Sequence, residues 1–488
     1  MKLKKLIKSL GRFHIDYPLR DFRVEGISCA SDKVKENFIF CAIKGNDFDG
    51  HKFIPEAIKR KAKVIILENP RFKIKNLKDV AFIQVEDTRL ALAKLAAYFY
   101  GHPSNRLKVV GITGTNGKTT ISYLIEAILK EANFNSAVIG TINYRFKNKI
   151  IPAKNTTPSS LEIQYLLNKM LKKKIDYVIM EVSSHALDQK RTAEINFYVG
   201  IFTNLTQDHL DYHHNLENYF EAKAKLFRGL SKNSVAIINQ DDPYGLRLKN
   251  LTKAKIITYG IEKKADIVAK DIKLDIDKTE FTLITKKEKI KLTTSLIGWH
   301  NVYNILAAVA FGLHEKIELK KIKSAIEKFK FVPGRLEKID SKKGFWVFVD
   351  YAHTEDALKN VISALREITE GRIIVVFGCG GQRDRNKRPK MGSVVSKMAD
   401  FFILTNDNPR SEDPKKIIED IKKGIKKDNF CVILRRRLAI KKALSLARPK
   451  DIVLIAGKGH ENYQIIGKRR IPFTDQEVVK ECLQSMNY

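Results

Sequence analysis

The stretch VVGITGTNGKTT, residues 109–120, decides how this chain folds around it. Apolar residues run into a glycine-rich turn, and an amphipathic run follows from Ile121 to Lys130, which predicts a strand, a loop and a helix. Glycines let backbone N–H groups approach a phosphate, while Lys118 adds a full charge and Thr119 offers a hydroxyl ligand to Mg²⁺. The stretch therefore predicts a phosphate-binding loop.

This loop departs from the strict P-loop pattern at one position, because Ile112 stands where that pattern has its first glycine. A glycine-rich turn with an incidental lysine is the alternative interpretation. The strand, glycines, lysine, hydroxyl and helix nevertheless arrive in the required order, so we expect the loop to bind ATP. The expected ATP-binding residues of the loop are Gly114, Thr115, Asn116, Gly117, Lys118, Thr119 and Thr120.

The composition describes a large globular chain with a strong positive charge. Its 488 residues are 44% hydrophobic and 30% charged, which suggests about three domains at the usual ~100–200 residues each. A net charge of +35 favours a nucleic-acid binder at first sight. The lysines, however, are spread along the chain, with no basic tail and no basic patch interleaved with aromatic residues. We therefore expect acidic small-molecule substrates and no nucleic-acid partner.

Cysteine usage and hydropathy indicate the compartment. The five cysteines are odd in number and form no C-x-x-C pair, so neither a disulfide framework nor a zinc site is indicated. The basic N-terminus lacks the apolar core of a signal peptide, and no apolar run approaches the ~18 residues of a membrane span. We expect a cytoplasmic monomer that does not associate with membranes.

Two breaks divide the chain into three predicted α/β units, 1–105, 106–333 and 334–488. The first break is the Gly/Pro/polar segment 101–105, and the second is Pro333-Gly334-Arg335. Short apolar runs at 64–67, 373–377 and 452–456 predict strands that alternate with helices. This pattern predicts a small N-terminal α/β domain, a central P-loop ATPase-like domain with a parallel sheet, and a C-terminal Rossmann-like domain. The last lacks G-x-G-x-x-G, so no NAD is expected.

Polar clusters follow the predicted strands of the second and third units. Glu181 ends an apolar strand, where a P-loop enzyme places a Mg²⁺ ligand, although a surface acid is the alternative. The run DHLDYH, residues 208–213, is compatible with a metal site or with a plain polar loop. DNPR at 407–410 and GKGHE at 457–461 also follow apolar strands. Because the carboxyl ends of parallel strands meet at one edge, these clusters predict a binding face.

Four motifs in this order resemble the Mur ligase family over essentially the whole chain. They are GTNGKTT (114–120), EVSSH (181–185), DHLDYH (208–213) and GKGHE (457–461). The resemblance implies a uridine-binding first domain and the ATP- and Mg²⁺-dependent joining of an amino acid to a UDP-muramoyl peptide through an acyl phosphate. One departure is Ala30-Ser31-Asp32, where the family usually has Asp-Ser-Arg.

The resemblance also implies roles for single residues. The residues matched to UDP-substrate binding are Ser31, Thr156, Thr157, Ser183, Gln189 and Arg191. Further nucleotide contacts match Asn301, Arg335 and Asp350, and the metal ligands match Thr119, Glu181, His209 and Lys223. Lys223 matches the lysine that becomes carbamylated (N6-carboxylysine) in this family, and its spacing from His209 distinguishes it from Lys225.

The D-N-P-R sequence marks, by resemblance, the members that add meso-diaminopimelate to UDP-N-acetylmuramoyl-L-alanyl-D-glutamate. The implied amino-acid pocket consists of Arg383, Asp407, Asn408, Pro409, Arg410, Gly457 and Glu461. Arg410 would bind the distal carboxylate with its planar fork, and Glu461 would bind the distal ammonium. A turn with a surface arginine is the alternative for this segment. The alternative functions are addition of L-lysine, a folylpolyglutamate-type ligase, a nucleic-acid motor and a non-catalytic nucleotide-binding module.

Overall fold

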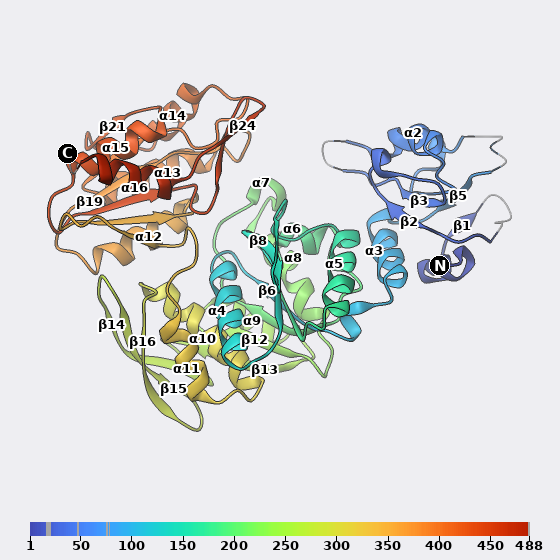
Figure 1. Ribbon diagram of the computed structural model, residues 1–488, viewed down its shortest axis with the longest axis horizontal. Helices are drawn as coiled ribbons and strands as arrows, with labels where there is room; N and C mark the ends of the chain where they lie inside the picture. The colour runs from blue at the N-terminus through green and yellow to red at the C-terminus, as the bar shows by residue number, and fades with distance from the viewer. Residues whose placement is uncertain (16–20, 46–47, 75–76, 78, 487–488) are drawn as a thin grey trace.

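The computed structural model describes residues 1–15, 21–45, 48–74, 77 and 79–486. It shows three α/β domains that follow one another along the chain (Figure 1), so the predicted fold class is confirmed. The N-terminal and C-terminal domains lie on opposite sides of the middle domain in this view.

The N-terminal domain is built on a five-stranded sheet of order β1-β5-β4-β3-β2. Strands β2 to β5 are parallel, and β1 pairs antiparallel with β5. The strands are β1 (His14–Ile15), β2 (Gly26–Ser28), β3 (Phe38–Cys41), β4 (Val64–Leu67) and β5 (Ala81–Gln84). The helices are α1 (Leu3–Ile7), α2 (Ile54–Lys59) and α3 (Thr88–Phe99), and α3 packs against helix α5 (Ser160–Lys172) of the middle domain.

The middle domain contains an eleven-stranded sheet of order β16-β15-β14-β13-β12-β11-β6-β10-β7-β8-β9. Its parallel centre consists of β6 (Lys108–Thr113), β7 (Ser136–Ile139), β10 (Tyr177–Glu181), β11 (Phe197–Phe202), β12 (Val235–Asn239), β13 (Lys255–Gly260) and β14 (Ile267–Leu274). The antiparallel edges are β8 (Asn143–Phe146) and β9 (Lys149–Pro152) on one side, and β15 (Thr279–Ile284) and β16 (Lys289–Thr294) on the other. Strands β10, β11 and β12 are almost wholly buried, as expected where helices cover both faces of a parallel sheet.

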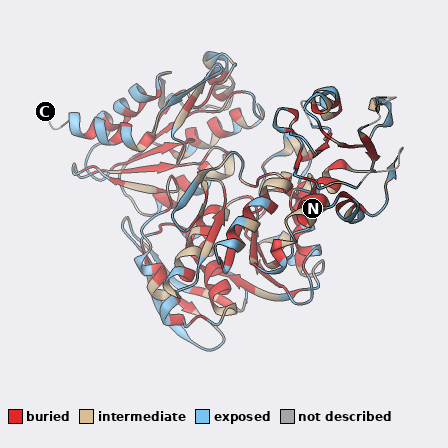
Figure 2. Cartoon of the chain, turned by 45° about the vertical axis from the view of Figure 1, so that its right-hand side comes forward, coloured by how far each residue is buried: buried red, intermediate tan, exposed pale blue. Residues whose placement is uncertain are grey.

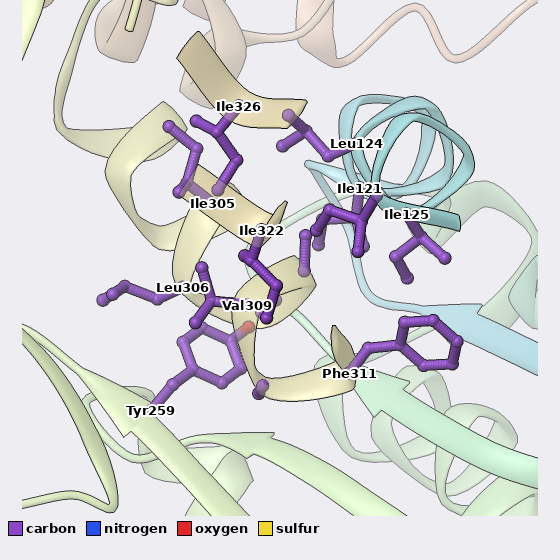
Figure 3. Packing of buried hydrophobic residues seen from close by; sticks show 14 of the residues in the cluster. Ile121, Leu124, Ile125, Tyr259, Ile305, Leu306, Val309, Phe311, Ile322 and Ile326 are labelled. Atoms are coloured by element: carbon purple, nitrogen blue, oxygen red, sulfur yellow. The ribbon is translucent and has the colours of Figure 1, made fainter. Parts of the chain in front are cut away.

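Helix α4 (Lys118–Glu131) follows β6 and is held by two neighbouring helices. Its apolar face, including Ile121 and Leu124, packs against α10 (Trp299–His314) and α11 (Leu319–Lys328), with Ile305 and Ile322 among the contacts (Figure 3). The remaining helices are α6 (Ser184–Asp188), α7 (Leu210–His213), α8 (Leu216–Arg228) and α9 (Pro243–Lys249). Anchoring α4 in this core fixes the N-terminus of the helix, and hence the loop before it.

The C-terminal domain has a six-stranded sheet of order β17-β18-β22-β19-β20-β21, in which β17 is the antiparallel edge strand. The strands are β17 (Glu337–Asp340), β18 (Trp346–Asp350), β19 (Ile373–Phe377), β20 (Phe401–Leu404), β21 (Phe430–Val432) and β22 (Ile452–Ala456), with a separate hairpin of β23 (Tyr463–Ile466) and β24 (Arg469–Pro472). The helices are α12 (Glu355–Arg366), α13 (Lys387–Met398), α14 (Pro414–Lys422), α15 (Arg436–Leu446) and α16 (Asp475–Ser485). The strands predicted at 373–377 and 452–456 are confirmed.

A tight turn joins the middle and C-terminal domains. Arg335 N donates to Val332 O at 3.0 Å, and Gly334 between them has a φ of +64°. A Cβ on Gly334 would lie 2.1 Å from the backbone nitrogen of His460, so only glycine allows this approach. Tyr351 N also donates to Gly334 O at 3.0 Å. The turn is therefore packed directly on the C-terminal domain.

Burial follows the sheets. The strands are buried and the outer faces of the helices are exposed (Figure 2). In the part of the chain that the structure describes, no helix has both the length and the apolar character that crossing a bilayer requires.

Candidate active site

The predicted phosphate loop lies between β6 and α4, and its conformation requires its glycines. Gly114 and Gly117 have φ values of +147° and +89°, which side chains other than glycine rarely adopt. A Cβ on Gly114 would lie 1.8 Å from Thr203 Oγ1, and one on Gly117 would lie 2.3 Å from Asn304 Oδ1. The loop thus has the compact, backbone-lined form that a phosphate site needs.

Two lysines converge on this loop. Lys118 Nζ donates to the carbonyl oxygens of Gly114 and Thr115 at 2.9 and 2.8 Å, and Lys223 Nζ on α8 donates to Gly114 O at 2.8 Å. Lys223 is buried, and its Nζ also lies 4.4 Å from the centre of the Tyr219 ring. Burial, followed by the charge of Lys118, holds the pKa of Lys223 well below its ordinary value. Burial also lowers the pKa of Lys118.

Lys225, two residues further along α8, has a different environment. Its Nζ pairs with Asp188 Oδ1 at 2.7 Å, and its side chain is 46% exposed. The structure therefore places Lys223, and not Lys225, beside the phosphate loop. Whether Lys223 carries a carbamate stays a prediction.

Glu181 ends β10 beside Thr119, as the sequence predicts. Thr119 Oγ1 donates to Glu181 Oε2 at 2.9 Å, and the backbone nitrogen of Thr141 donates to Oε1 at 3.0 Å. A Cβ on Gly140 would lie 2.3 Å from Glu181 Oε1, so a glycine at this position makes room for the carboxylate. Carboxylate and hydroxyl oxygens this close together are hard ligands, and they fit Mg²⁺.

The DHLDYH segment surrounds the start of α7. His209 has a φ of +54°, and its ring centre lies 4.8 Å from that of His185. His213 is buried, and its Nε2 lies 2.9 Å from Ser184 Oγ; burial lowers its pKa to about 4. Among the described residues, no three or more His, Cys, Asp or Glu side chains form a metal-binding group. A metal ion here would therefore need other oxygen ligands, such as those of phosphates or a carbamate.

The residues predicted to bind the UDP substrate fall into two groups. Arg191 donates through Nη1 to Thr157 O at 3.0 Å and through Nε to Gln189 Oε1 at 3.0 Å, and Ser183 N donates to Thr157 Oγ1 at 3.0 Å. Thr156 Oγ1 lies 3.1 Å from Thr141 Oγ1. These residues form one connected patch of the middle domain.

Ser31 lies apart from that patch, in the N-terminal domain, where its Oγ donates to Glu56 Oε2 at 2.7 Å. An ion pair between Lys190 of the middle domain and Asp87 of the N-terminal domain connects the two regions. Close to Asp87 in the chain, Arg89 donates to Lys44 O at 2.9 Å, and its charge, after burial, helps to lower the pKa of Arg191. The predicted uridine segment thus reaches the edge of the middle-domain patch.

Two predicted nucleotide contacts, Asn301 and Arg335, line one cavity of about 120 Å³. The guanidinium of Arg335 lies 4.5 Å from the centre of the Tyr351 ring. Asp350 is buried behind it and accepts hydrogen bonds from Leu336 N at 2.6 Å and Ala352 N at 2.7 Å. Asp350 therefore orders the joining turn, and its predicted ribose contact stays a prediction.

The residues predicted to bind the amino acid lie together at the carboxyl ends of β19, β20 and β22. Arg410 has a φ of +53°, and its Nη1 donates to Gly381 O at 2.7 Å. Burial, followed by the charge of Arg383, lowers the pKa of Arg410. Gly457 has a φ of +111°, and a Cβ there would lie 2.7 Å from Asp407 Oδ2. Pro409, whose backbone Gly381 contacts, completes the turn.

A buried lysine that sequence reasoning missed organises this pocket. Lys458 Nζ donates to Glu461 Oε2 at 2.8 Å and to Asn408 Oδ1 at 3.2 Å, and Asn408 Nδ2 donates to the same Glu461 oxygen at 2.8 Å. Lys458 is fully buried. The second oxygen of Glu461 takes part in none of these bonds. The GKGHE motif could have indicated it, because a lysine only two residues after a fully buried strand is expected to be buried and to need a partner.

Comparison with known proteins matches all three domains. Residues 23–100 match the Mur ligase family catalytic domain, residues 112–312 the Mur ligase middle domain, and residues 334–459 the glutamate ligase domain of Mur ligases. A relative from Clostridium tetani (strain Massachusetts / E88), the UDP-N-acetylmuramoyl-L-alanyl-D-glutamate--2,6-diaminopimelate ligase, is 45% identical over 100% of both chains. The ligase of the same name from Aquifex aeolicus (strain VF5) is 47% identical over 94% of both.

A solved structure of a UDP-N-acetylmuramoyl-L-alanyl-D-glutamate--2,6-diaminopimelate ligase superposes with a TM-score of 0.67 at 33% identity, covering 95% of each chain. The phosphate loop, the paired lysines and the pocket around Arg410 thus occur in a chain that matches these relatives from end to end. On this basis the chain belongs to the Mur ligase family.

Proposed function

We propose that the chain is an ATP-dependent ligase that adds meso-2,6-diaminopimelate to the D-glutamate γ-carboxylate of UDP-N-acetylmuramoyl-L-alanyl-D-glutamate, in peptidoglycan biosynthesis. We infer the amino acid from the position of Arg410, which lies near Asp407 and near the cluster of Asn408, Lys458 and Glu461. ATP and a UDP-linked substrate are soluble cytoplasmic metabolites, so we place the reaction in the cytoplasm.

The reaction needs activation because a carboxylate does not react with an amine at neutral pH. Transfer of the γ-phosphoryl group to the substrate carboxylate gives an acyl phosphate, the amine attacks its carbonyl carbon, and phosphate leaves as the amide forms. The protein mainly positions the reactants and neutralises charge. Lys118 and the backbone N–H groups of the loop hold the ATP phosphates in this scheme. To do so, Lys118 exchanges its bonds to Gly114 O and Thr115 O for phosphate oxygens.

The donors fit two Mg²⁺ ions: Thr119 and Glu181 would hold one, and His209 with a carbamate on Lys223 would hold the second. When bound, the ions would neutralise charge on the phosphate oxygens. Lys223 suits carbamylation, because a buried lysine with a lowered pKa has a neutral amine that can add to carbon dioxide. The carbamate would supply oxygen ligands, which Mg²⁺ prefers to a neutral amine, whereas an ammonium group would repel the ion.

Discrimination between diaminopimelate and L-lysine rests on one carboxylate. Arg410 binds the distal carboxylate, and the free oxygen of Glu461 binds the distal ammonium. L-lysine lacks that carboxylate and leaves Arg410 without an anionic partner, which is costly for a half-buried charge. Arg383 adds a second positive charge beside Arg410.

The experiment that tests this function is phosphate release from ATP by the purified protein with UDP-N-acetylmuramoyl-L-alanyl-D-glutamate and a panel of amino acids. We expect turnover with meso-diaminopimelate and little with L-lysine. A Lys118→Ala variant should lose turnover and still bind the UDP substrate in calorimetry, because the uridine segment lies in another domain. Stimulation by single-stranded nucleic acid, or by folate with glutamate, in place of these substrates would refute the proposal.

A further inference from the structure

One carboxylate of the C-terminal domain joins that domain to two loops of the middle domain. Asp356 Oδ2, in the first turn of α12, accepts hydrogen bonds from Asn116 Nδ2 at 3.0 Å and Thr206 Oγ1 at 2.9 Å. Asn360, one turn further along α12, donates to the same oxygen at 3.2 Å. Figure 1 shows α12 on the side of the C-terminal domain that faces the middle domain.

Both loops reached by Asp356 belong to the reaction centre. Asn116 is part of the phosphate loop, and its backbone is fixed by Thr203 Oγ1, which donates to Asn116 O at 2.6 Å. Thr206 precedes the DHLDYH segment, and its backbone nitrogen donates to Thr115 Oγ1 at 3.0 Å. The two loops are thus bonded to each other, and a single oxygen of the other domain bonds to both.

We propose that Asp356 is a positioning residue that docks the amino-acid-binding domain onto the phosphate loop in the geometry needed for amide formation. The proposal rests on the ligase function above, because that reaction requires the amine in the C-terminal domain to meet an acyl phosphate formed on the middle domain. An error of about 1 Å between reacting groups costs up to about 100-fold in rate. A carboxylate suits the task, because hydrogen bonds to a charged acceptor are stronger than neutral ones.

The two middle-domain donors to Asp356 come from separate loops. Both hydrogen bonds can therefore form only when the two loops have the relative arrangement seen here. Displacing either loop weakens a bond to the C-terminal domain. Asp356 therefore links the state of the phosphate loop to the placement of the incoming amine.

The first test compares Asp356→Ala with Glu355→Ala. Glu355 is the neighbouring acid in the same first turn of α12, so its removal has a similar effect on the helix dipole. We expect Asp356→Ala to lower kcat about 10- to 100-fold, because the amine and the acyl phosphate lose their mutual alignment. The KM for the UDP substrate should stay within twofold, and Glu355→Ala should behave as wild type. Equal kcat in both variants would overturn the proposal.

A double-mutant cycle distinguishes docking from a general loss of structure. Thr206→Val removes one donor and should lower kcat less than Asp356→Ala does. The double variant should be no worse than Asp356→Ala alone, because the valine removes a bond that is already lost. Fully additive effects on kcat would show that Asp356 does not act through Thr206, and would refute the proposal.

Small-angle X-ray scattering of the full chain provides a readout that does not depend on turnover. Loss of Asp356 should shift the ligand-free protein toward a larger radius of gyration, while Glu355→Ala should superpose on wild type. An unchanged profile for Asp356→Ala, with an unchanged melting temperature, would contradict the docking role. If the protein adds no diaminopimelate, the proposed function fails, and the scattering experiment still decides whether Asp356 holds the domains together.

Discussion

Lys118 and Lys223 donate hydrogen bonds to the same carbonyl oxygen, that of Gly114, at 2.9 and 2.8 Å. Two ammonium groups this close repel each other, and the buried one gives up its proton more readily. Lys118 thus belongs to the phosphate loop, and α8 places beside it a second, buried lysine whose lowered pKa favours the neutral amine.

Replacement of Lys223 by alanine should abolish most activity, because the carbamate oxygens would be lost. High bicarbonate should not restore turnover, whereas a short carboxylic acid added in solution should restore part of it. Lys225→Ala, an exposed change on the same helix, is the matched control and should remain active. Isotope-labelled bicarbonate should give a carbamate signal by NMR in wild type alone. Full activity in Lys223→Ala would rule out the carbamate role.

Loss of Arg410 should weaken binding of diaminopimelate selectively. Removing one partner of a buried charge pair costs roughly 2–5 kcal/mol, or about 30- to 5,000-fold. Arg410→Ala should therefore raise the KM for diaminopimelate strongly and leave the KM for ATP nearly unchanged. Arg385→Ala removes an exposed arginine from a nearby loop and should change neither value. If wild-type protein adds L-lysine as efficiently as diaminopimelate, the pocket has been misassigned.

Lys458→Met should raise the KM for diaminopimelate about tenfold or more, because Asn408 and Glu461 lose the cation that orients both. Lys468→Met, an exposed lysine at the turn of the β23–β24 hairpin, is the control. Steady-state kinetics with ATP and with diaminopimelate varied separately provides the measurement. Equal increases in both KM values would indicate a folding defect, which a melting curve would reveal.

Gly140→Ala should impair the proposed metal site although it replaces none of the proposed metal ligands. The added Cβ would lie 2.3 Å from Glu181 Oε1 and must displace the carboxylate. We expect the Mg²⁺ concentration needed for half-maximal activity to rise several-fold. Gly229→Ala, at an exposed position with a φ of −80° where the nearest atom to the new Cβ would be 3.3 Å away, is a control for the glycine-to-alanine change itself.

Stability should fall on acidification, and His300 at the start of α10 should contribute. Burial lowers the pKa of His300 to about 4, from an ordinary value of about 6.5. Between these values the unfolded chain binds a proton that the folded protein does not, so the free energy of unfolding decreases as pH falls. One such histidine contributes roughly 1–3 kcal/mol. His300→Gln should flatten the pH dependence of urea unfolding across this window, and an unchanged slope would contradict the burial argument.

Much of the fold could be predicted because the chain repeats one local pattern. Runs such as Ile373–Phe377 and Ile452–Ala456 are wholly apolar, which happens when helices cover both faces of a parallel strand. The start of α4 was harder to predict. Its first turn, Lys118-Thr119-Thr120, contains two β-branched threonines, which are poor helix formers, and these residues also belong to the phosphate-loop motif.

The parts of the site that could not be predicted depend on distant partners. Glu181 stood out at the end of its predicted strand, and Lys223 was identified only through the resemblance to the family. Gly140 and Thr141, by contrast, matter only because β7 lies beside β10 and ends next to Glu181. Asp356 is a further example, because nothing in its neighbours along the chain shows that a loop 240 residues earlier donates to it. Pairings between domains leave no periodic trace in a sequence.

The turn at Gly334 determines where the C-terminal domain of one ligase can be joined to the middle domain of another. Because Gly334 is packed on the backbone of Gly459 and His460, the turn and Arg335 belong structurally to the C-terminal domain. We therefore expect any hinge between the middle and C-terminal domains to lie before the turn, in residues 329–331 after the end of α11. A chimera that imports a foreign C-terminal domain should be joined within this short segment, so that the turn and its arginine stay with the domain on which they pack.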